Sequence, residues 1–381
     1  MTIPPPFNVR FAKLRIEMKR MGVSVFVCDH GEMLAWLTGY TVSETRYRAC
    51  IVPAKGEPIW VLRAIDHAPC TRASWIKEVR SFSDDLDPFV CVAEVITEVA
   101  SDTLIGADFN SYGFTAHALE RLRNALPGYQ WCDLNGISDR LRAIKDEGEL
   151  ALLRQAAEIG DGAMAALVHN LRPGMRPRDA AAIASTFYLQ NGADDWWVGP
   201  IACSKHAQKS TADIDFLHPS GFTDLPLISG DILHAELVPR VAGYSARMMR
   251  SISIGPANAV SHALIDRLIT LQDMQFDQMK PGACAHDVDA ILRRAVLAEG
   301  LRATYPNATG YQIGLYSKTP RSSDFSLCFH PGADWHLEEG MTFHMYLSAQ
   351  GHSISESVVI GKRSAERLTK SKRGICETSI I

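Results

Sequence analysis

Two glutamates stand in short apolar runs of the chain, where a carboxylate is unexpected. Glu236 lies in the run DILHAEL, and Glu356 lies in the alternating run SISESVVI. Burying a carboxylate costs free energy unless the group is paired with a cation or has a function. In an active site, such a group attacks an electrophilic carbon or serves as a general base. Both glutamates are therefore candidate catalytic residues. The alternatives are a buried ion pair for Glu236 and surface exposure for Glu356.

Two arginines follow shortly after Glu236, in the segment GYSARMMRSISIG. The guanidinium of Arg247 offers a planar fork of donors that clamps a carboxylate or stabilises a developing oxyanion. Arg247 is thus a candidate substrate-binding residue. The alternative is a structural ion pair between Glu236 and Arg247 or Arg250, and such a pair is compatible with a function for the glutamate.

Histidine, tyrosine and tryptophan supply further candidates. His218 stands in DFLHPSG, and an imidazole with a pKa of about 6.5 suits proton transfer; the alternative is a structural loop histidine. Tyr311 in TGYQIGL and Tyr346 in MTFHMYL donate hydrogen bonds to a substrate or pack in the core. Trp197 in DDWWVGP lines a binding pocket or packs at an interface.

The elements that must position these residues fall into two groups. Residues 1–142 have the pattern of a small α/β domain, and residues 143–381 have the pattern of an α+β domain in which helix pairs pack on a sheet. In the first domain, helices are expected at 7–22 and 115–128, with strands at 23–29, 33–40, 49–62 and 103–109. In the second domain, helices are expected at 146–171, 176–192, 259–282 and 286–300, with strands at 231–237, 250–255, 341–347 and 355–360.

Composition excludes several classes of protein. A hydrophobic content of 46% with 22% charged residues is typical of a folded globular chain. The formal net charge of −4 gives no electrostatic basis for a nucleic-acid partner. No apolar run is long enough to span a membrane, and the N-terminal residues lack the apolar run of a signal peptide. The nine cysteines contain no CxxC pair. We therefore expect no membrane partner and a cytoplasmic location with reduced thiols.

An ordered set of motifs runs through the second domain. It comprises RAIKDEGEL, LRPGMRPRD, GDILHAELVPRVAGYSARMMRSISIG, MKPGACAHDV, TGYQIGL, LEEGMTFHMYL and SESVVI. Each motif is weak alone, but their order and spacing resemble the pita-bread superfamily of creatinase, prolidase and aminopeptidase P. The resemblance implies an α/β N-terminal creatinase-type domain followed by an α+β pita-bread C-terminal domain.

The resemblance also locates the metal positions of that superfamily. Metal-dependent members hold two divalent ions with two aspartates, a histidine and two glutamates. By motif, these positions fall here on Glu236, Arg247, Tyr311, Tyr346 and Glu356. An arginine is always cationic and a neutral tyrosine is a poor ligand for divalent ions. We therefore expect no metal and no other cofactor.

Among metal-free relatives, the chain resembles creatinase and, in TGYQIGL and GMTFH, ectoine hydrolase. Both cleave C–N bonds in small amino-acid derivatives. Creatinase keeps a catalytic histidine shortly before the GD motif, and His218 stands at that place. The expected function is a metal-independent hydrolase acting on a small zwitterionic cyclic amidine, lactam or guanidino compound. The alternatives are a non-catalytic binding module and an Xaa-Pro dipeptidase-like metallopeptidase. The loop YSKTPRSSDFS departs from the ectoine-hydrolase pattern, so the substrate stays open.

The creatinase-like N-terminal domain adds one further expectation. In creatinase this domain offers an arginine to the substrate carboxylate across a dimer. Arg46 and Arg48, in SETRYRACIVP, stand at that place. We therefore expect a homodimer in which these arginines bind substrate; the alternative is that they are ordinary surface residues.

Overall fold

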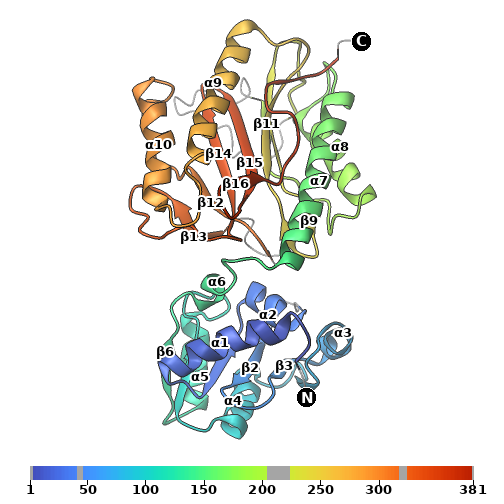
Figure 1. Ribbon diagram of the computed structural model, residues 1–381. Coiled ribbons are helices and arrows are strands. Elements are labelled where there is room, and N and C mark those ends of the chain that lie inside the picture. Colours follow the sequence, from blue (N-terminus) through green and yellow to red (C-terminus); the bar gives the residue numbers. More distant parts are fainter. Residues whose placement is uncertain (1–2, 41–45, 204–223, 317–323, 380–381) are drawn as a thin grey trace. The chain divides into compact units, whose positions relative to one another are not determined.

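The computed structural model describes residues 3–40, 46–203, 224–316 and 324–379. The chain divides into two compact units, Met1–Arg142 and Ala143–Ile381. Their helices and strands are labelled in Figure 1. Among the described helices, none is both long and apolar enough to cross a bilayer.

The first unit is built around a six-stranded sheet with the strand order β4-β3-β2-β1-β5-β6. Strand β1 pairs antiparallel with β2 and parallel with β5. Buried strand residues on one face of this sheet pack against α4 and α5 in a hydrophobic core. The strands are β1 Val25–Cys28, β2 Ala49–Pro53, β3 Ile59–Arg63, β4 Glu78–Phe82, β5 Leu104–Ala107 and β6 Gln130–Asp133. The helices are α1 Phe7–Met21, α2 Gly31–Thr38, the 3-10 turn η1 Ala64–Asp66, α3 His67–Ala73, α4 Pro88–Val99, α5 Ala116–Ala125 and α6 Ile137–Arg140.

The segment expected as a strand at 33–40 is instead helical. It lies in α2, which ends at Gly39 with a left-handed φ of 78°. Leu34 and Leu37 are fully buried. A short, continuously apolar run fits a buried helix as well as a buried strand, so the pattern alone does not separate them. By contrast, the helix expected to stop at Gly22 does so, with Gly22 as its left-handed C-cap.

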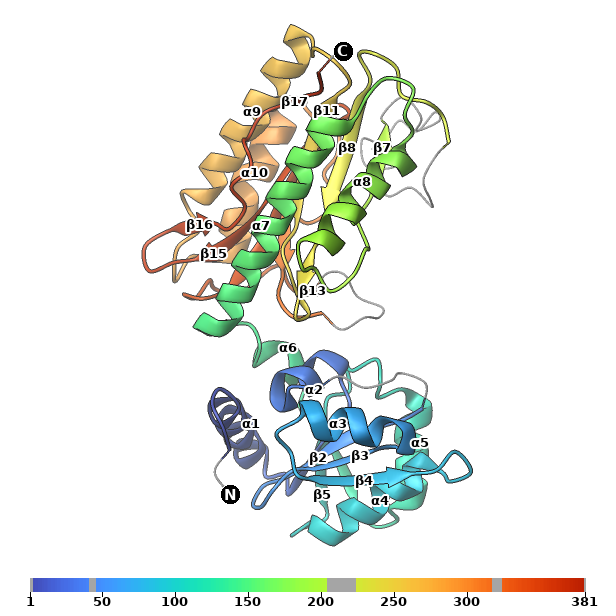
Figure 2. The same ribbon diagram turned by 90° about the vertical axis from the view of Figure 1, so that its right-hand side faces the viewer.

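The second unit carries a nine-stranded sheet whose main path has the order β13-β12-β14-β15-β11-β8-β7. Strand β16 pairs with β15 and β17 with β11, while β9 and β10 form a separate two-stranded ribbon. Figure 2 shows the long helices α7 and α9 lying along this unit. The helices are α7 Glu147–Asn170, α8 Pro177–Gln190, α9 Ala259–Phe276 and α10 Ala285–Ala298. The strands are β7 Ile201–Cys203, β8 Ile232–Leu237, β9 Arg240–Val241, β10 Tyr244–Ser245, β11 Met248–Ser253, β12 Gly310–Gln312, β13 Asp324–Phe329, β14 Thr342–Ala349, β15 His352–Ile360, β16 Ala365–Arg367 and β17 Cys376–Glu377.

The two faces of the large sheet differ in chemistry. One face is mostly apolar: Met345 and Val358 pack with α10, and Leu347 and Ile354 pack with α9 and α10. Helix α7 approaches the same face, since a Cβ on Gly160 would lie 3.9 Å from the side chain of Met248. Because successive side chains of a strand alternate, the residues between these apolar positions point to the other face. We call the first side the helix face and the second the polar face.

Candidate active site

Strand register places one row of site residues across the polar face. Glu236 in β8 lies opposite Met249 in β11, and Met249 lies opposite Ser355 in β15. Ser355 in turn lies opposite Tyr346 in β14. Directly opposed residues in an antiparallel pair share a face. Glu236, Ser355 and Tyr346 are thus brought to one side of the sheet from three different strands.

A second row runs beside the first. His344 in β14 lies opposite Ser357 in β15 and opposite Tyr311 in β12. Arg247 immediately precedes β11. Its backbone N–H donates to Ser357 Oγ at 2.7 Å, and Ser357 Oγ donates to the Arg247 carbonyl at 2.8 Å. These bonds fix Arg247 between the strands that carry Glu236 and His344.

Glu236 and Arg247 form a buried ion pair on this face. Arg247 Nη2 donates to Glu236 Oε1, and the two side chains are only 4% and 6% exposed. Burial by itself raises the pKa of the Glu236 carboxyl, but the charge of Arg247 brings that pKa below its usual value. Burial likewise lowers the pKa of Arg247, and Glu236 more than reverses this. Both groups are therefore charged at neutral pH.

A hydrogen-bonded chain of hydroxyls and imidazole adjoins the ion pair. His344 Nδ1 lies 2.9 Å from Tyr311 Oη, and His344 Nε2 lies 2.6 Å from Ser355 Oγ. Burial, and next the charge of Arg247, lowers the pKa of His344 to about 3. The imidazole is therefore neutral, with one nitrogen donating and the other accepting. Burial also raises the pKa of Tyr311 well above its usual value, so its phenol stays protonated.

Tyr346 is the more open member of the group. Its ring stacks on that of His344 with an interplanar angle of 15°, and it is only half-buried whereas His344 is buried. Asn307 Nδ2 donates to Tyr346 Oη at 3.2 Å. Burial is the main cause that raises the pKa of Tyr346. This phenol is thus a neutral hydrogen-bonding group on the least buried side chain of the cluster.

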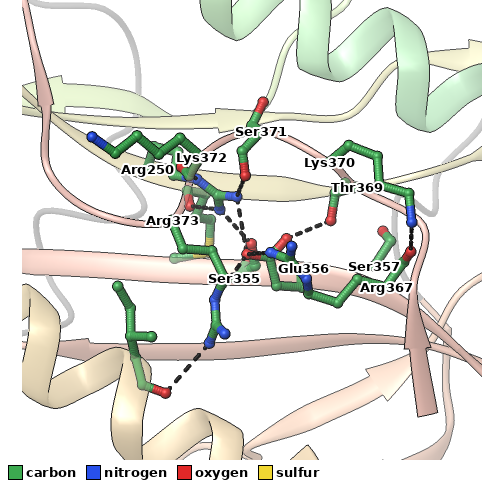
Figure 3. Close-up of polar contacts among 12 residues, drawn as sticks. Arg250, Ser355, Glu356, Ser357, Arg367, Thr369, Lys370, Ser371, Lys372 and Arg373 are labelled. Atoms are coloured by element: carbon green, nitrogen blue, oxygen red, sulfur yellow. Dashed lines mark hydrogen bonds and ion pairs between the residues drawn. The ribbon is translucent and has the colours of Figure 1, made fainter.

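The structure does not bring Glu356 into this group, which corrects the expected pairing of two catalytic carboxylates. Glu356 follows Ser355 directly, so its side chain points to the helix face. There Oε1 accepts from Arg250 Nη2 at 2.9 Å, and Oε2 accepts from Thr369 Oγ1 at 2.5 Å. Figure 3 shows Glu356 enclosed by these groups together with Arg367 and Arg373. The glutamate is a buried ion-pair centre on the far side of the sheet from Glu236.

The remaining predicted site residues of this unit are placed differently. His218 lies outside the described residues. Trp197 is 39% exposed on the loop between α8 and β7. The same loop then passes tightly by Glu236, because a Cβ on Gly199 would lie 2.8 Å from the Glu236 carbonyl oxygen. Trp197 is thus two residues away in sequence from Gly199, which packs closely against the backbone of Glu236.

Arg46 and Arg48 both belong to the first unit and bond within it. Arg46 donates to the carbonyl oxygens of Asp84 and Leu86, each at 2.9 Å. Arg48 is buried, and its Nη1 donates to the Asp29 carbonyl at 3.0 Å. A role in substrate binding stays a prediction for both.

The side chains of the polar face do not fit a two-metal centre. Within residues 3–40, 46–203, 224–316 and 324–379, no group of three or more His, Cys, Asp and Glu is placed to hold a metal ion. Arg247 sits beside Glu236 and would repel a divalent cation. Glu356, the other carboxylate expected here, faces the opposite side. The donor set of ion pair, phenols, hydroxyl and neutral imidazole instead suits hydrogen bonding to a polar organic molecule.

Sequence reasoning did not identify His344 and Ser355 as site residues. The signal was present as period-two alternation: His344 and Tyr346 are two residues apart in β14, and Ser353, Ser355 and Ser357 alternate in β15. Once Tyr346 is assigned to the polar face, the same alternation assigns His344 to that face. For Ser355 the register between β14 and β15 is needed.

Comparison with known proteins places the fold in a family. The model of "Metallopeptidase family M24" matches residues 151–362, and that of "Creatinase/Prolidase N-terminal domain" matches residues 10–144. Ectoine hydrolase from Halomonas elongata is 25% identical over 381 residues, covering 94% of each chain. Xaa-Pro dipeptidase from Pyrococcus horikoshii is 24% identical over 269 residues, covering 69% of this chain and 71% of that one. The crystal structure of a prolidase from Thermococcus sibiricus aligns with a TM-score of 0.82 at 19% identity, covering 99% of this chain and 100% of that one.

These matches confirm the predicted fold class of a creatinase-type N-terminal domain followed by a pita-bread domain. They extend over both units, so the likeness is not confined to one part of the chain. The protein therefore belongs to metallopeptidase family M24, a family of hydrolases, with a creatinase/prolidase N-terminal domain preceding the family domain.

Proposed function

We propose that this protein is a metal-independent hydrolase that cleaves a C–N bond in a small zwitterionic amino-acid derivative, namely a cyclic amidine, a lactam or a guanidino compound. The observation that carries the proposal is the buried Glu236–Arg247 ion pair on the polar face. A zwitterionic ligand can replace both halves of this pair, because its cationic group binds Glu236 and its carboxylate binds Arg247. The similarity to ectoine hydrolase supports the same substrate class.

The chemistry follows from the groups present. In hydrolysis, the elements of water are added across the C–N bond, and the leaving nitrogen takes up a proton. Glu236 either attacks the electrophilic carbon, giving a covalent intermediate that water then hydrolyses to release the free carboxylate, or it removes a proton from water that attacks the carbon. With Arg247 on the substrate carboxylate, Tyr311 and Tyr346 donate hydrogen bonds to the atom on which negative charge develops. His218 protonates the leaving nitrogen in this proposal.

An Xaa-Pro dipeptidase activity is the second candidate, because relatives of that name cover most of the chain. Against it stands the chemistry of the polar face, where a guanidinium and two phenols occupy positions that metal-dependent members use for ligands. A binding module without catalysis is the third candidate. It is compatible with the fold but leaves the buried ion pair and the neutral imidazole without a function.

An activity panel separates these candidates. The purified protein is assayed against ectoine-like cyclic amidines, lactams, guanidino acids and Xaa-Pro dipeptides, each with and without a chelator. We expect turnover of a cyclic or guanidino compound, unchanged by the chelator, and no stoichiometric divalent metal by elemental analysis. Dipeptide cleavage that is lost with chelator and restored by metal would overturn the proposal, and no turnover of any compound would favour the binding module.

The same assay tests Glu236 directly. Glu236→Gln removes the charge but keeps the shape, and we expect it to lower kcat by about 10²–10⁴-fold, the range typical of general acid–base groups. The matched control is Glu158→Gln, since Glu158 is exposed on α7. Unfolding curves of wild type and both variants are recorded, because the loss of the Glu236 charge also leaves the buried charge of Arg247 uncompensated. A stability loss without a kcat effect would assign Glu236 a structural role only.

A further inference from the structure

The side-chain amide of Asn307 has one determined orientation. Arg302 Nη2 donates to Asn307 Oδ1 at 3.0 Å, and Asn307 Nδ2 donates to the Ala308 carbonyl at 2.9 Å. A guanidinium only donates and a carbonyl only accepts. Exchanging the amide oxygen and nitrogen would place two donors together on one side and two acceptors together on the other. The NH₂ group of Asn307 therefore faces the Ala308 carbonyl and Tyr346.

This orientation sets the polarity of the bond to Tyr346. Asn307 Nδ2 donates to Tyr346 Oη at 3.2 Å, so the phenol oxygen accepts that bond. The hydroxyl proton of Tyr346 must then point away from Asn307. Tyr346 lies on the polar face beside His344 and Tyr311 and is partly exposed, so its proton is left for a partner other than Asn307.

Asn307 is itself held rigidly from the direction of α10. Arg293 Nη2 donates to the Asn307 carbonyl at 2.9 Å, and Arg293 pairs with Asp289 at 2.6 Å. Asp289 Oδ1 also accepts from Thr309 Oγ1 at 2.8 Å. The Thr309 carbonyl accepts from the backbone N–H of Tyr346 at 3.1 Å. The loop that carries Asn307 and the strand that carries Tyr346 are thus tied to the same ion pair.

We infer that Asn307 is a positioning residue that keeps the Tyr346 hydroxyl oriented as a hydrogen-bond donor to the substrate. The inference rests on the proposed function, in which Tyr346 is a hydrogen-bond donor, and it identifies Asn307 as the group that orients this donor. Tyr346 donates to the oxygen or nitrogen on which negative charge develops when water or Glu236 adds to the C–N carbon. A donor that is already oriented needs no reorganisation at that step, which is the condition under which such bonds accelerate a reaction. Asn307 acts only through Tyr346.

Two substitutions of Asn307 distinguish this role from a merely structural one. In Asn307→Asp, a carboxylate oxygen replaces the amide nitrogen and accepts from the phenol, so the Tyr346 proton turns away from the substrate. In Asn307→Ala, the phenol loses a partner but stays free to donate to the substrate. We therefore expect kcat to fall further in Asn307→Asp than in Asn307→Ala. Stability should follow the reverse order, because Asp gives the buried Arg302 a charged partner that outweighs the new acceptor beside the Ala308 carbonyl, and Ala gives it none.

A double-mutant cycle with Tyr346→Phe tests whether Asn307 acts through Tyr346. Loss of one preorganised donor costs about 10²–10³-fold in kcat. We expect Tyr346→Phe to lower kcat by an amount near the lower end of that range. In the Tyr346→Phe background, Asn307→Asp should produce no further loss. Losses that multiply, or a kcat order that follows the stability order, would overturn the inference.

A measurement without substrate keeps this test separate from that of the proposed function. The protein is labelled with 3-fluorotyrosine, and the ¹⁹F resonance of Tyr346 is assigned by its absence in Tyr346→Phe. We expect Asn307→Asp to shift this resonance while that of Tyr129, in the first unit, stays unchanged. A Tyr346 resonance that does not move would refute the inference even if the activity panel succeeds. A shift in a protein inactive on the whole panel would support the hydrogen bond while the proposed function fails.

Discussion

At the scale of single residues, the site pairs its charges and links its imidazole to two hydroxyls before a ligand arrives. Glu236 neutralises Arg247, and His344 links Tyr311 to Ser355. Nearly all of these side chains are buried. A ligand must therefore replace internal partners with equivalent ones, which favours molecules that carry both a cation and a carboxylate over singly charged ones.

The neutral state of His344 leads to a prediction on pH. Burial lowers its pKa from 6.5 to about 3 in the folded protein. Between these values the unfolded chain binds a proton that the folded protein does not bind, so the free energy of unfolding decreases as the pH falls through this window. The contribution of one such group approaches about 1.4 kcal/mol per pH unit. We expect wild type to lose stability faster than His344→Gln from pH 6.5 to 4.5.

Urea unfolding at several pH values measures this difference. The comparison of each variant with wild type removes the effect of the carboxylates that titrate in both proteins. His336→Gln serves as the control, because His336 is exposed, and its stability should change with pH as that of wild type does. Parallel curves for wild type and His344→Gln would show that the imidazole is not held neutral by the fold.

At the scale of elements, the C-terminal segment 365–373 covers the helix face around Glu356. Glu356 binds Arg250 of β11 at 2.9 Å and Thr369 of this segment at 2.5 Å. On the other side, the carboxylate of Asp161 in α7 accepts from the backbone N–H groups of Lys370 and Ser371, each at 2.7 Å. Residues far apart in sequence thus fasten the segment to both the sheet and a helix.

We therefore predict that Glu356→Gln loosens the C-terminal segment and leaves the polar face in place. Removing the charge leaves the fully buried guanidinium of Arg250 without its carboxylate, and breaking a buried pair in this way costs about 3–5 kcal/mol. Hydrogen exchange measured by mass spectrometry should show faster exchange in residues 365–373. Glu366→Gln, at an exposed position of the same segment, is the control. Unchanged exchange in Glu356→Gln would contradict this account of the ion-pair centre.

At the scale of the whole molecule, the chain combines two units that each have their own core. Each is matched by a different family model. The candidate residues on the polar face all belong to the second unit, whereas Arg46 and Arg48 belong to the first. A contribution of the first unit to substrate binding therefore depends on how domains or subunits assemble.

We predict that the protein is a homodimer in which Arg46 assists substrate binding in trans. Symmetric dimers are the commonest oligomers, and an arginine suits the carboxylate of a zwitterionic substrate. Light scattering after size-exclusion chromatography should give twice the mass of the chain. Arg46→Ala should raise KM more than it lowers kcat, with Arg72→Ala, an exposed arginine of the same unit, as control. A monomer with full activity would refute the prediction.

The sequence by itself determined the architecture. Ordered motifs predicted the two-domain fold, helical periodicity predicted α1 and α7, and Gly22 marked the end of α1. Motif position also predicted that Arg247 and two tyrosines stand where metal-dependent relatives hold ligands, and this assignment stays a prediction. Helical periodicity and helix ends are local properties, and the order of motifs is a property of the linear chain, so all of them can be read from the sequence.

Only the tertiary structure decided which side chains meet. Ser355 and Glu356 are neighbours in sequence, and a shift of one residue moves a side chain to the other face of a sheet. Motif spacing placed Glu356 with Glu236, whereas the pairing of β15 with β14 and β11 places Ser355 there. The sequence did not predict that α2 is a helix for a related reason, because a continuous apolar run shows neither helical nor strand periodicity. Register and burial arise from contacts between distant segments, and these are absent from any single stretch of sequence.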